Sequence, residues 1–179
     1  MLYTINTFSG KQFDPYFAEK ADICIEDIAH ALSLMTRANG HFSDFYSVAQ
    51  HSIACCLEAK ARNEEPKTAL FCLLHDSAEA YMSDVTRPVK ARMPQFKEAE
   101  EKLLSLIFSV LAGGEPNNEQ KKTVKEIDDA LLHAEFHHFM NIDFDDDTKP
   151  LVTSPDFSTI PFKAAEKEFL ELYNELAKE

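Results

Sequence analysis

The segment Ala69-Leu70-Phe71-Cys72-Leu73-Leu74-His75-Asp76 decides how this chain is interpreted. The apolar run from Ala69 to Leu74 predicts a buried helix, and an imidazole and a carboxyl group follow it directly. Burying such groups without partners is costly, so they must be hydrogen-bonded, ion-paired or bound to a metal ion. We therefore expect His75 and Asp76 to belong to a metal site.

The composition of the whole chain favours helices. Its 179 residues are 45% hydrophobic and include four glycines, two of them adjacent at Gly113-Gly114. So few glycines disfavour an architecture of strands and turns, and the length suits one domain over residues 1–179 with a sizeable core. We predict an all-α protein with a short hairpin or irregular arm at residues 3–13.

Apolar periodicity and capping residues give the expected helices. Ser47 is a suitable N-cap, Pro66 and Pro94 fit helix starts, and Gly113 fits a helix end. The expected helices cover about 23–34, 47–62, 66–82, 94–113, 118–141 and 162–178. The acidic, proline-containing stretch 143–161 predicts a solvated loop, as does the polar stretch 36–41.

His51 is expected to lie level with His75. The helices over 47–62 and 66–82 form an antiparallel hairpin around residue 64. His51 lies about thirteen residues before that turn and His75 about eleven after it, so at about 1.5 Å per residue their heights differ by about 3 Å. Cys55 and Ala59 share a stripe with His51, which therefore points inward.

Asp128 is the fourth expected ligand. It lies on the apolar face that Ile127 and Leu131 define on the helix over 118–141, whereas Asp129 faces away. The alternative is a buried hydrogen-bonded network, which explains one such residue more easily than four converging ones. We expect a divalent cation on the following set, whose two neutral imidazoles and two carboxylates balance its charge: His51, His75, Asp76 and Asp128.

Two carboxyl groups near this set are candidate catalytic residues. Glu79 is expected on the helix face of His75 and Asp76, where it can accept or relay a proton, and Asp84 follows shortly after. The contributions of His41, Glu135 and His138 stay open. The four cysteines lack C-x-x-C spacing and are interpreted as reduced residues, mostly in the core, rather than ligands.

The charge distribution indicates which kinds of molecule the chain could bind. A net charge of -13 disfavours a nucleic acid polymer. The window 85–97 contains Arg87 and Lys90 among four basic residues and no acidic one, so it is either a phosphate-binding segment or a solvated basic turn. We find no secretion signal after Met1 and no apolar run long enough for a membrane span, so we expect a cytoplasmic protein.

The pattern of His51, His75-Asp76 and Asp128 resembles that of the HD-domain phosphohydrolase superfamily. The likeness extends to the 5′-deoxynucleotidase-like branch through four segments: Ser47-Val48-Ala49-Gln50-His51-Ser52, His75-Asp76-Ser77-Ala78-Glu79 with Asp84 beyond it, Arg87-Pro88-Val89-Lys90, and Val124-Lys125-Glu126-Ile127-Asp128. It implies a helical bundle, and one divalent metal ion whose identity (Mn, Co, Fe, Mg, Ni or Zn) the sequence does not give.

The resemblance also implies a phosphate contact by Arg37, with Arg87 and Lys90 as further candidates. Deoxynucleotidases of this branch carry Trp directly after that arginine, where this chain has Ala38. Selectivity for deoxyribose therefore does not carry over.

We expect a phosphohydrolase that acts on a nucleoside monophosphate or similar small phosphomonoester, and a homodimer is compatible with this expectation. The alternatives are a phosphodiesterase or pyrophosphohydrolase on nucleotides, and a non-catalytic, metal-stabilised nucleotide-binding module.

Overall fold

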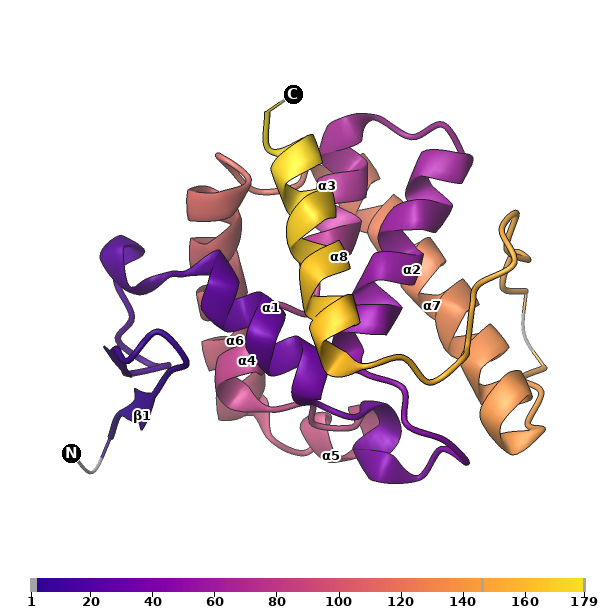
Figure 1. Cartoon of the computed structure of the whole chain (residues 1–179), viewed down its shortest axis with the longest axis horizontal. Helices are drawn as coiled ribbons and strands as arrows, with labels where there is room; N and C mark the ends of the chain where they lie inside the picture. The colour runs from indigo at the N-terminus through magenta and orange to yellow at the C-terminus, as the bar shows by residue number, and fades with distance from the viewer. Residues whose placement is uncertain (1–2, 146, 179) are drawn as a thin grey trace.

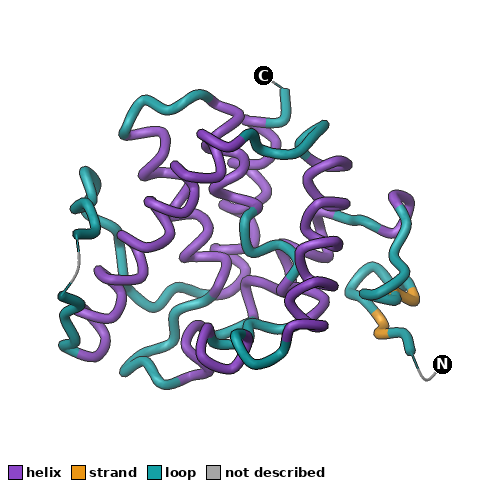
Figure 2. The backbone as a smooth tube through the Cα atoms, turned by 180° about the vertical axis from the view of Figure 1, so that it is seen from behind, coloured by secondary structure: helices purple, strands orange, loops and turns teal. Residues whose placement is uncertain are grey.

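The structure is a computed structural model that describes residues 3–145 and 147–178. Helices form most of the backbone, and the two short strands are confined to the N-terminal arm (Figure 2). The strands β1 (Ile5–Asn6) and β2 (Gln12–Phe13) pair antiparallel. An all-α fold with a short N-terminal hairpin is therefore confirmed.

Eight α-helices follow within the described residues, with 3₁₀ turns at Lys20–Asp22 and Arg37–Gly40. They are α1 (Ile25–Leu34), α2 (Val48–Ala61), α3 (Pro66–Leu74), α4 (Glu79–Met82), α5 (Arg87–Lys90), α6 (Pro94–Leu111), α7 (Asn118–Met140) and α8 (Phe162–Leu176). The long helices match the expected ranges except over 66–82, where the chain forms α3 and α4 instead of one helix. The structure adds α5, a single turn inside the basic window.

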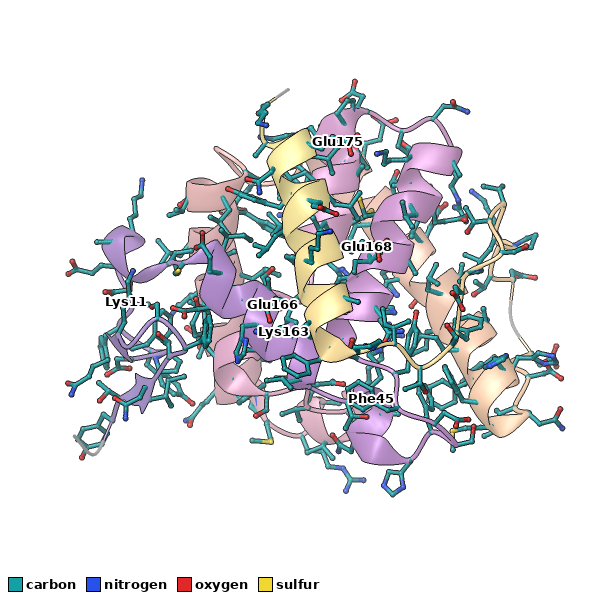
Figure 3. All side chains as sticks on the ribbon, viewed as in Figure 1. Lys11, Phe45, Lys163, Glu166, Glu168 and Glu175 are labelled. Carbon is teal, nitrogen blue, oxygen red and sulfur yellow. The ribbon has the colours of Figure 1, made fainter. Side chains whose placement is uncertain are left out.

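Helix α3 lies at the centre of the bundle. Every residue from Thr68 to Leu74 is buried, and α3 packs against α2, α7 and α8. Helix α8 also packs on α1, with Glu166 accepting a hydrogen bond from His30 on α1 at 3.1 Å (Figures 1 and 3). An apolar helix enclosed on several sides explains why residues 69–74 show no polar face.

The hairpin of α2 and α3 is set by local sequence. Ser47 caps α2 by accepting from the Gln50 amide at 3.1 Å, and the Gln50 side chain accepts from the Ser47 amide at 3.2 Å. Pro66 opens α3, where its missing N–H leaves no helical bond unmade. These signals fix where both helices start and hence how the two histidines align.

The expected continuous helix over 66–82 is wrong. Helix α3 ends at Leu74 and α4 begins at Glu79, with tight turns between them. In these turns the Ser77 amide donates to the Leu74 carbonyl and the Glu79 amide to the Asp76 carbonyl, each at 3.0 Å and three residues apart. Glu79 therefore does not share a continuous helix face with His75 and Asp76, which lie in the turn itself.

Two buried carboxylates anchor the chain outside the bundle. Asp27 on α1 accepts from the Ser9 amide at 2.6 Å and from the Ser9 hydroxyl at 2.8 Å, which holds the N-terminal arm. Glu58 on α2 accepts from the amides of Val152 and Thr153, each at 2.9 Å, which holds the segment before α8.

No helix of the described residues has both the length and the apolar character needed to cross a membrane.

Candidate metal centre

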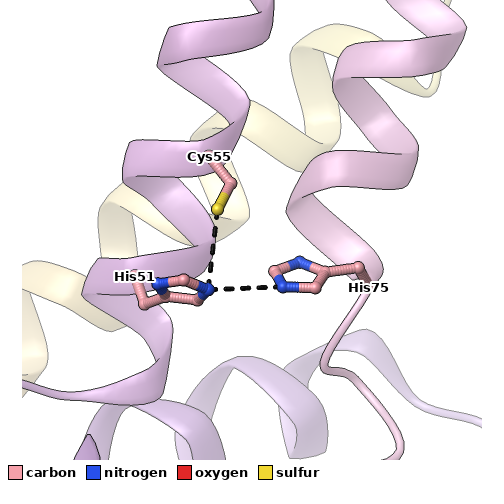
Figure 4. Close-up of side chains that lie close together, drawn as sticks. All are labelled: His51, Cys55 and His75. Carbon is pink, nitrogen blue, oxygen red and sulfur yellow. Dashed lines mark hydrogen bonds between the residues drawn. The ribbon is translucent and has the colours of Figure 1, made fainter. Parts of the chain in front are cut away.

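His51 and His75 meet at the end of the central hairpin. Their Nε2 atoms lie 3.3 Å apart, one side chain coming from the first turn of α2 and the other from the turn after α3 (Figure 4). His51 is fully buried. The rise per residue predicted that the two histidines lie at similar heights along the hairpin, and the contact between their rings agrees with this prediction.

The carboxylates of Asp76 and Asp128 complete a ring of donors around these nitrogens. His51 Nε2 lies 3.3 Å from Asp128 Oδ1, and His75 Nε2 lies 3.3 Å from Asp76 Oδ2. The two cross distances are both 3.8 Å. Donors about 2.0–2.2 Å from one ion lie about 3–3.5 Å apart, so these four residues fit a divalent metal.

The outer nitrogen of each imidazole already has an acceptor. His75 Nδ1 donates to the Cys72 carbonyl at 2.8 Å, and His51 Nδ1 contacts Glu135 Oε1 at 2.6 Å. A carbonyl oxygen only accepts, so in neutral His75 the hydrogen is on Nδ1 and the lone pair of Nε2 faces the centre. The same tautomer of His51 follows if Glu135 is ionised. When both imidazoles are neutral, two lone pairs and two carboxylates converge, an arrangement that a cation between them stabilises.

Glu135 is one of the three residues whose contribution the sequence left open, with His41 and His138. It is fully buried on α7 and accepts from Arg37 Nη2 at 3.1 Å as well as from His51. Burial opposes its ionisation, but the charge of Arg37, and that of His51 when it is protonated, outweigh burial and lower the pKa of Glu135. In the sequence, the signal for Glu135 was its position on the apolar face of the helix that forms α7. A carboxylate that orients a metal-binding histidine in this way raises its basicity.

Cys55 lies on the inner side of the centre. Its Sγ atom is 3.6 Å from His51 Nε2, and the donor atoms of Cys55, His51 and His75 all lie within 4.8 Å of one another (Figure 4). Cys55 is one helical turn after His51 on α2. The cysteines are free, as expected, but the structure brings one of them to the histidines.

Arg87 contacts the centre from the solvent side. Its guanidinium donates to Asp128 Oδ2 at 2.7 Å and to Asp129 Oδ1 at 2.9 Å, although its side chain is 57% exposed. Asp128 therefore directs one oxygen to the histidines and the other to Arg87. Burial opposes ionisation of Asp128, but hydrogen bonds from His51 and His75, when these rings are protonated, hold its pKa well below the usual range.

Glu79 and Asp84 are carboxyl groups with raised pKa values. Burial, followed by the negative charges of Asp76 and Asp84, raises the pKa of Glu79 well above its usual range. Burial also raises the pKa of Asp84, with Asp76 contributing. Glu79 Oε1 lies 3.7 Å from Lys90 Nζ, while Glu79 Oε2 is buried without a hydrogen-bond partner among the described residues. Glu79 thus favours its protonated form.

Two basic candidates and two further histidines differ in how close their contacts bring them to the centre. Arg37 is buried, and its Nη1 atom lies 3.6 Å from Asp76 Oδ2. Lys90 donates to Glu100 at 2.8 Å. His41 is exposed, and His138 packs against Phe139 and Phe157, so neither is placed at the centre by its contacts.

A cavity of about 470 Å³ borders the centre between α6 and α7. His75 and Asp128 form part of its wall, with apolar surface from Leu104 and Phe108 and basic groups from Lys121 and Lys125 among the rest. Its size lies within the range of small-ligand sites.

Comparison with known proteins identifies the family. A family model described as an HD domain matches residues 38–146. The uncharacterized protein YfdR of Escherichia coli (strain K12) is 43% identical over 103 residues, which are 58% of this chain and 55% of that protein. An uncharacterized protein of Rhodobacter capsulatus is 35% identical over 106 residues, 55% of this chain and 53% of that protein.

The chain therefore spans about half the length of the curated relatives it matches. HD domains bind divalent metal ions and are in general metal-dependent phosphohydrolases. The matched residues include every histidine and aspartate of the donor ring. The chain belongs to the HD-domain family.

Proposed function

We propose that this chain hydrolyses a small phosphomonoester, a nucleoside monophosphate, at the centre formed by His51, His75, Asp76 and Asp128. The observation that carries the proposal is the pairing of two Nε2 atoms at 3.3 Å while both Nδ1 atoms have acceptors elsewhere. With neutral imidazoles, this arrangement leaves only electron-pair donors at the centre.

One divalent ion is proposed to bind these four residues, as Mn, Co, Fe, Mg, Ni or Zn. When bound, such an ion lowers the pKa of a coordinated water and polarises a phosphoryl oxygen. Two carboxylates and two neutral imidazoles balance its charge. Glu135 and the Cys72 carbonyl hold the imidazole rings in the orientation that presents Nε2.

Glu79 and Asp84 are the proposed proton-transfer residues. A carboxyl group whose pKa is raised well above its usual range can hold a proton and deliver it to the oxygen of a departing alcohol. Asp84 is the second candidate, because its pKa is raised as well and its charge is among those acting on Glu79. No covalent nucleophile is required.

The phosphate is proposed to contact Arg37, Arg87 and Lys90. Arg37 is held by Glu135 and lies beside Asp76, so its position is fixed before a substrate arrives. Arg87 is exposed and shares its guanidinium between Asp128 and Asp129, which leaves it free to exchange Asp129 for a phosphate oxygen. Guanidinium geometry suits bidentate contact with phosphate.

The organic part of the substrate is proposed to be a nucleoside. The sequence segments around the donor ring resemble those of the 5′-deoxynucleotidase-like branch, and the cavity beside His75 and Asp128 offers room for a group attached to the phosphate. Ala38 stands where that branch has Trp, so we expect weak discrimination between deoxyribose and ribose.

The proposal is tested by a screen of deoxyribo- and ribonucleoside monophosphates against each of the six metals, with released phosphate as the readout. His75→Ala, prepared in the same way, is the control for contaminating phosphatases. Phosphate release by the wild type that His75→Ala lacks supports the proposal. No release above the level of His75→Ala with any nucleotide and metal would overturn it.

A further inference from the structure

We infer that Cys55 gives this centre a second coordination set, in which a thiophilic ion such as Zn²⁺ or Cd²⁺ binds His51 Nε2, His75 Nε2 and Cys55 Sγ. Harder ions such as Mg²⁺ and Mn²⁺ bind through the carboxylates instead. The inference rests on the metal centre of the proposed function and adds a residue that determines which metal it prefers.

The spacing of the three donors supports this set. For a tetrahedral zinc ion with Zn–N of about 2.0–2.1 Å and Zn–S of about 2.3 Å, the N···N separation is about 3.4 Å and the N···S separation about 3.6 Å. The observed values are 3.3 Å between the two Nε2 atoms and 3.6 Å between His51 Nε2 and Cys55 Sγ. Two of the three separations thus already match those that the ion requires, and the third, between His75 and Cys55, is at most 4.8 Å.

The backbone holds this geometry in place. His51 and Cys55 are four residues apart on α2, so their side chains lie on the same face one turn apart. Both are buried, and His75 is fixed from α3 by its bond to the Cys72 carbonyl. Little rearrangement is needed for Cys55 to become a ligand.

The charge and the softness of the donor atoms decide which of the two ligand sets a given metal ion binds. Thiolate sulfur favours zinc and other soft ions, whereas carboxylate oxygen suits Mg²⁺ and Mn²⁺. Formation of the metal–sulfur bond breaks the S–H bond of Cys55, and the proton leaves to water. Asp128 Oδ1, 3.3 Å from His51 Nε2, is placed to supply the fourth ligand and a second negative charge.

The test compares the wild type with Cys55→Ala and with Cys56→Ala, a matched control because Cys56 is the neighbouring buried cysteine. Each protein is loaded with Co²⁺, and thiolate-to-cobalt charge transfer is measured in the near-ultraviolet. We expect the band in the wild type and in Cys56→Ala, and its loss in Cys55→Ala. Cys55→Ser, which retains more of the side-chain volume, is a second variant should Cys55→Ala fold poorly.

A competition titration gives a second readout that does not depend on activity. We expect the affinity for Cd²⁺ relative to Mn²⁺ to fall in Cys55→Ala by about tenfold or more, because even groups that only orient a ligand alter metal affinity by about 10–100-fold. A wild-type protein that binds Co²⁺ without charge transfer would overturn the inference and leave the proposed function standing. A wild-type protein that binds none of these ions would overturn both.

Discussion

His51 Nδ1 and Glu135 Oε1 lie 2.6 Å apart, so the first turn of α2 is tied to α7 by a buried hydrogen bond behind the donor ring. Glu135 also binds Arg37, which approaches Asp76 on the other side. One carboxylate thus sets both a histidine ring and an arginine. This relationship makes Glu135 the first residue to test after the ligands themselves.

Glu135→Gln should weaken metal binding by about 10–100-fold, because the imidazole of His51 loses its anionic acceptor and Arg37 loses its ionic partner. The measurement is a competitive metal titration on folded protein. Glu126→Gln is a matched control on the same helix, since Glu126 pairs with lysines at the surface. Equal affinity in both variants would remove Glu135 from the centre.

His75→Ala should lose the bound metal ion, because its Nε2 atom is one of the converging donors. Metal content is measured by elemental analysis after chelation and reloading. His137→Ala is the control, since His137 is exposed and pairs with Asp143. If His75→Ala reloads to the same content as His137→Ala, the assignment of ligands is wrong.

Glu79→Gln should keep the metal and lower kcat by about 10²-fold or more, the usual contribution of a general acid or base. The carboxyl group is buried beside Asp76 and Asp84, and its raised pKa suits proton transfer. Steady-state kinetics on reloaded protein give the comparison, with Glu98→Gln as an exposed control on α6. Unchanged turnover would leave Asp84 as the proton-transfer residue.

Arg87→Ala should raise KM for every phosphomonoester alike, because a charge-assisted phosphate contact does not depend on the base or the sugar. Asp129→Asn should shift KM in the opposite direction, since Asp129 competes for the same guanidinium at 2.9 Å. Both variants are measured with the same series of nucleotides. A change in KM confined to one base would show that Arg87 contacts the nucleoside instead.

Glu58→Gln should destabilise the fold by about 1–3 kcal/mol at pH 7, because the Glu58 carboxylate accepts from Thr153, Val152 and Arg62. Burial opposes its ionisation, but these hydrogen bonds hold the pKa of Glu58 below its ordinary value. A lowered folded-state pKa contributes stability that is present above the unfolded value of about 4.3 and is lost as the pH falls through the folded value.

Urea titrations across that pH range check the sign. The free energy of unfolding of the wild type should approach that of Glu58→Gln as the pH falls below about 4.3. Glu175→Gln, at an exposed pair with Lys60, should lie close to the wild type throughout. A gap between wild type and Glu58→Gln that does not narrow in acid would show that the carboxylate's charge is not what holds the segment.

The sequence by itself determined where α2 and α3 start and the level of the two histidines. Ser47 and Gln50 cap α2 within one turn, and Pro66 opens α3, so both signals are local. Once two helices form a hairpin, the rise per residue fixes which side chains are level. For that reason the approach of His51 to His75 follows from counting residues.

Only the tertiary structure decided how the turn after α3 is shaped and what surrounds the histidines. Residues 75–78 have no proline or glycine to signal the end of α3, yet the chain turns there. Glu135, Cys55 and Arg87 reach the centre from α7, α2 and α5. Such contacts depend on how each helix is rotated about its axis and how closely it packs, and that is set by the fit of buried side chains along the whole bundle rather than by local sequence.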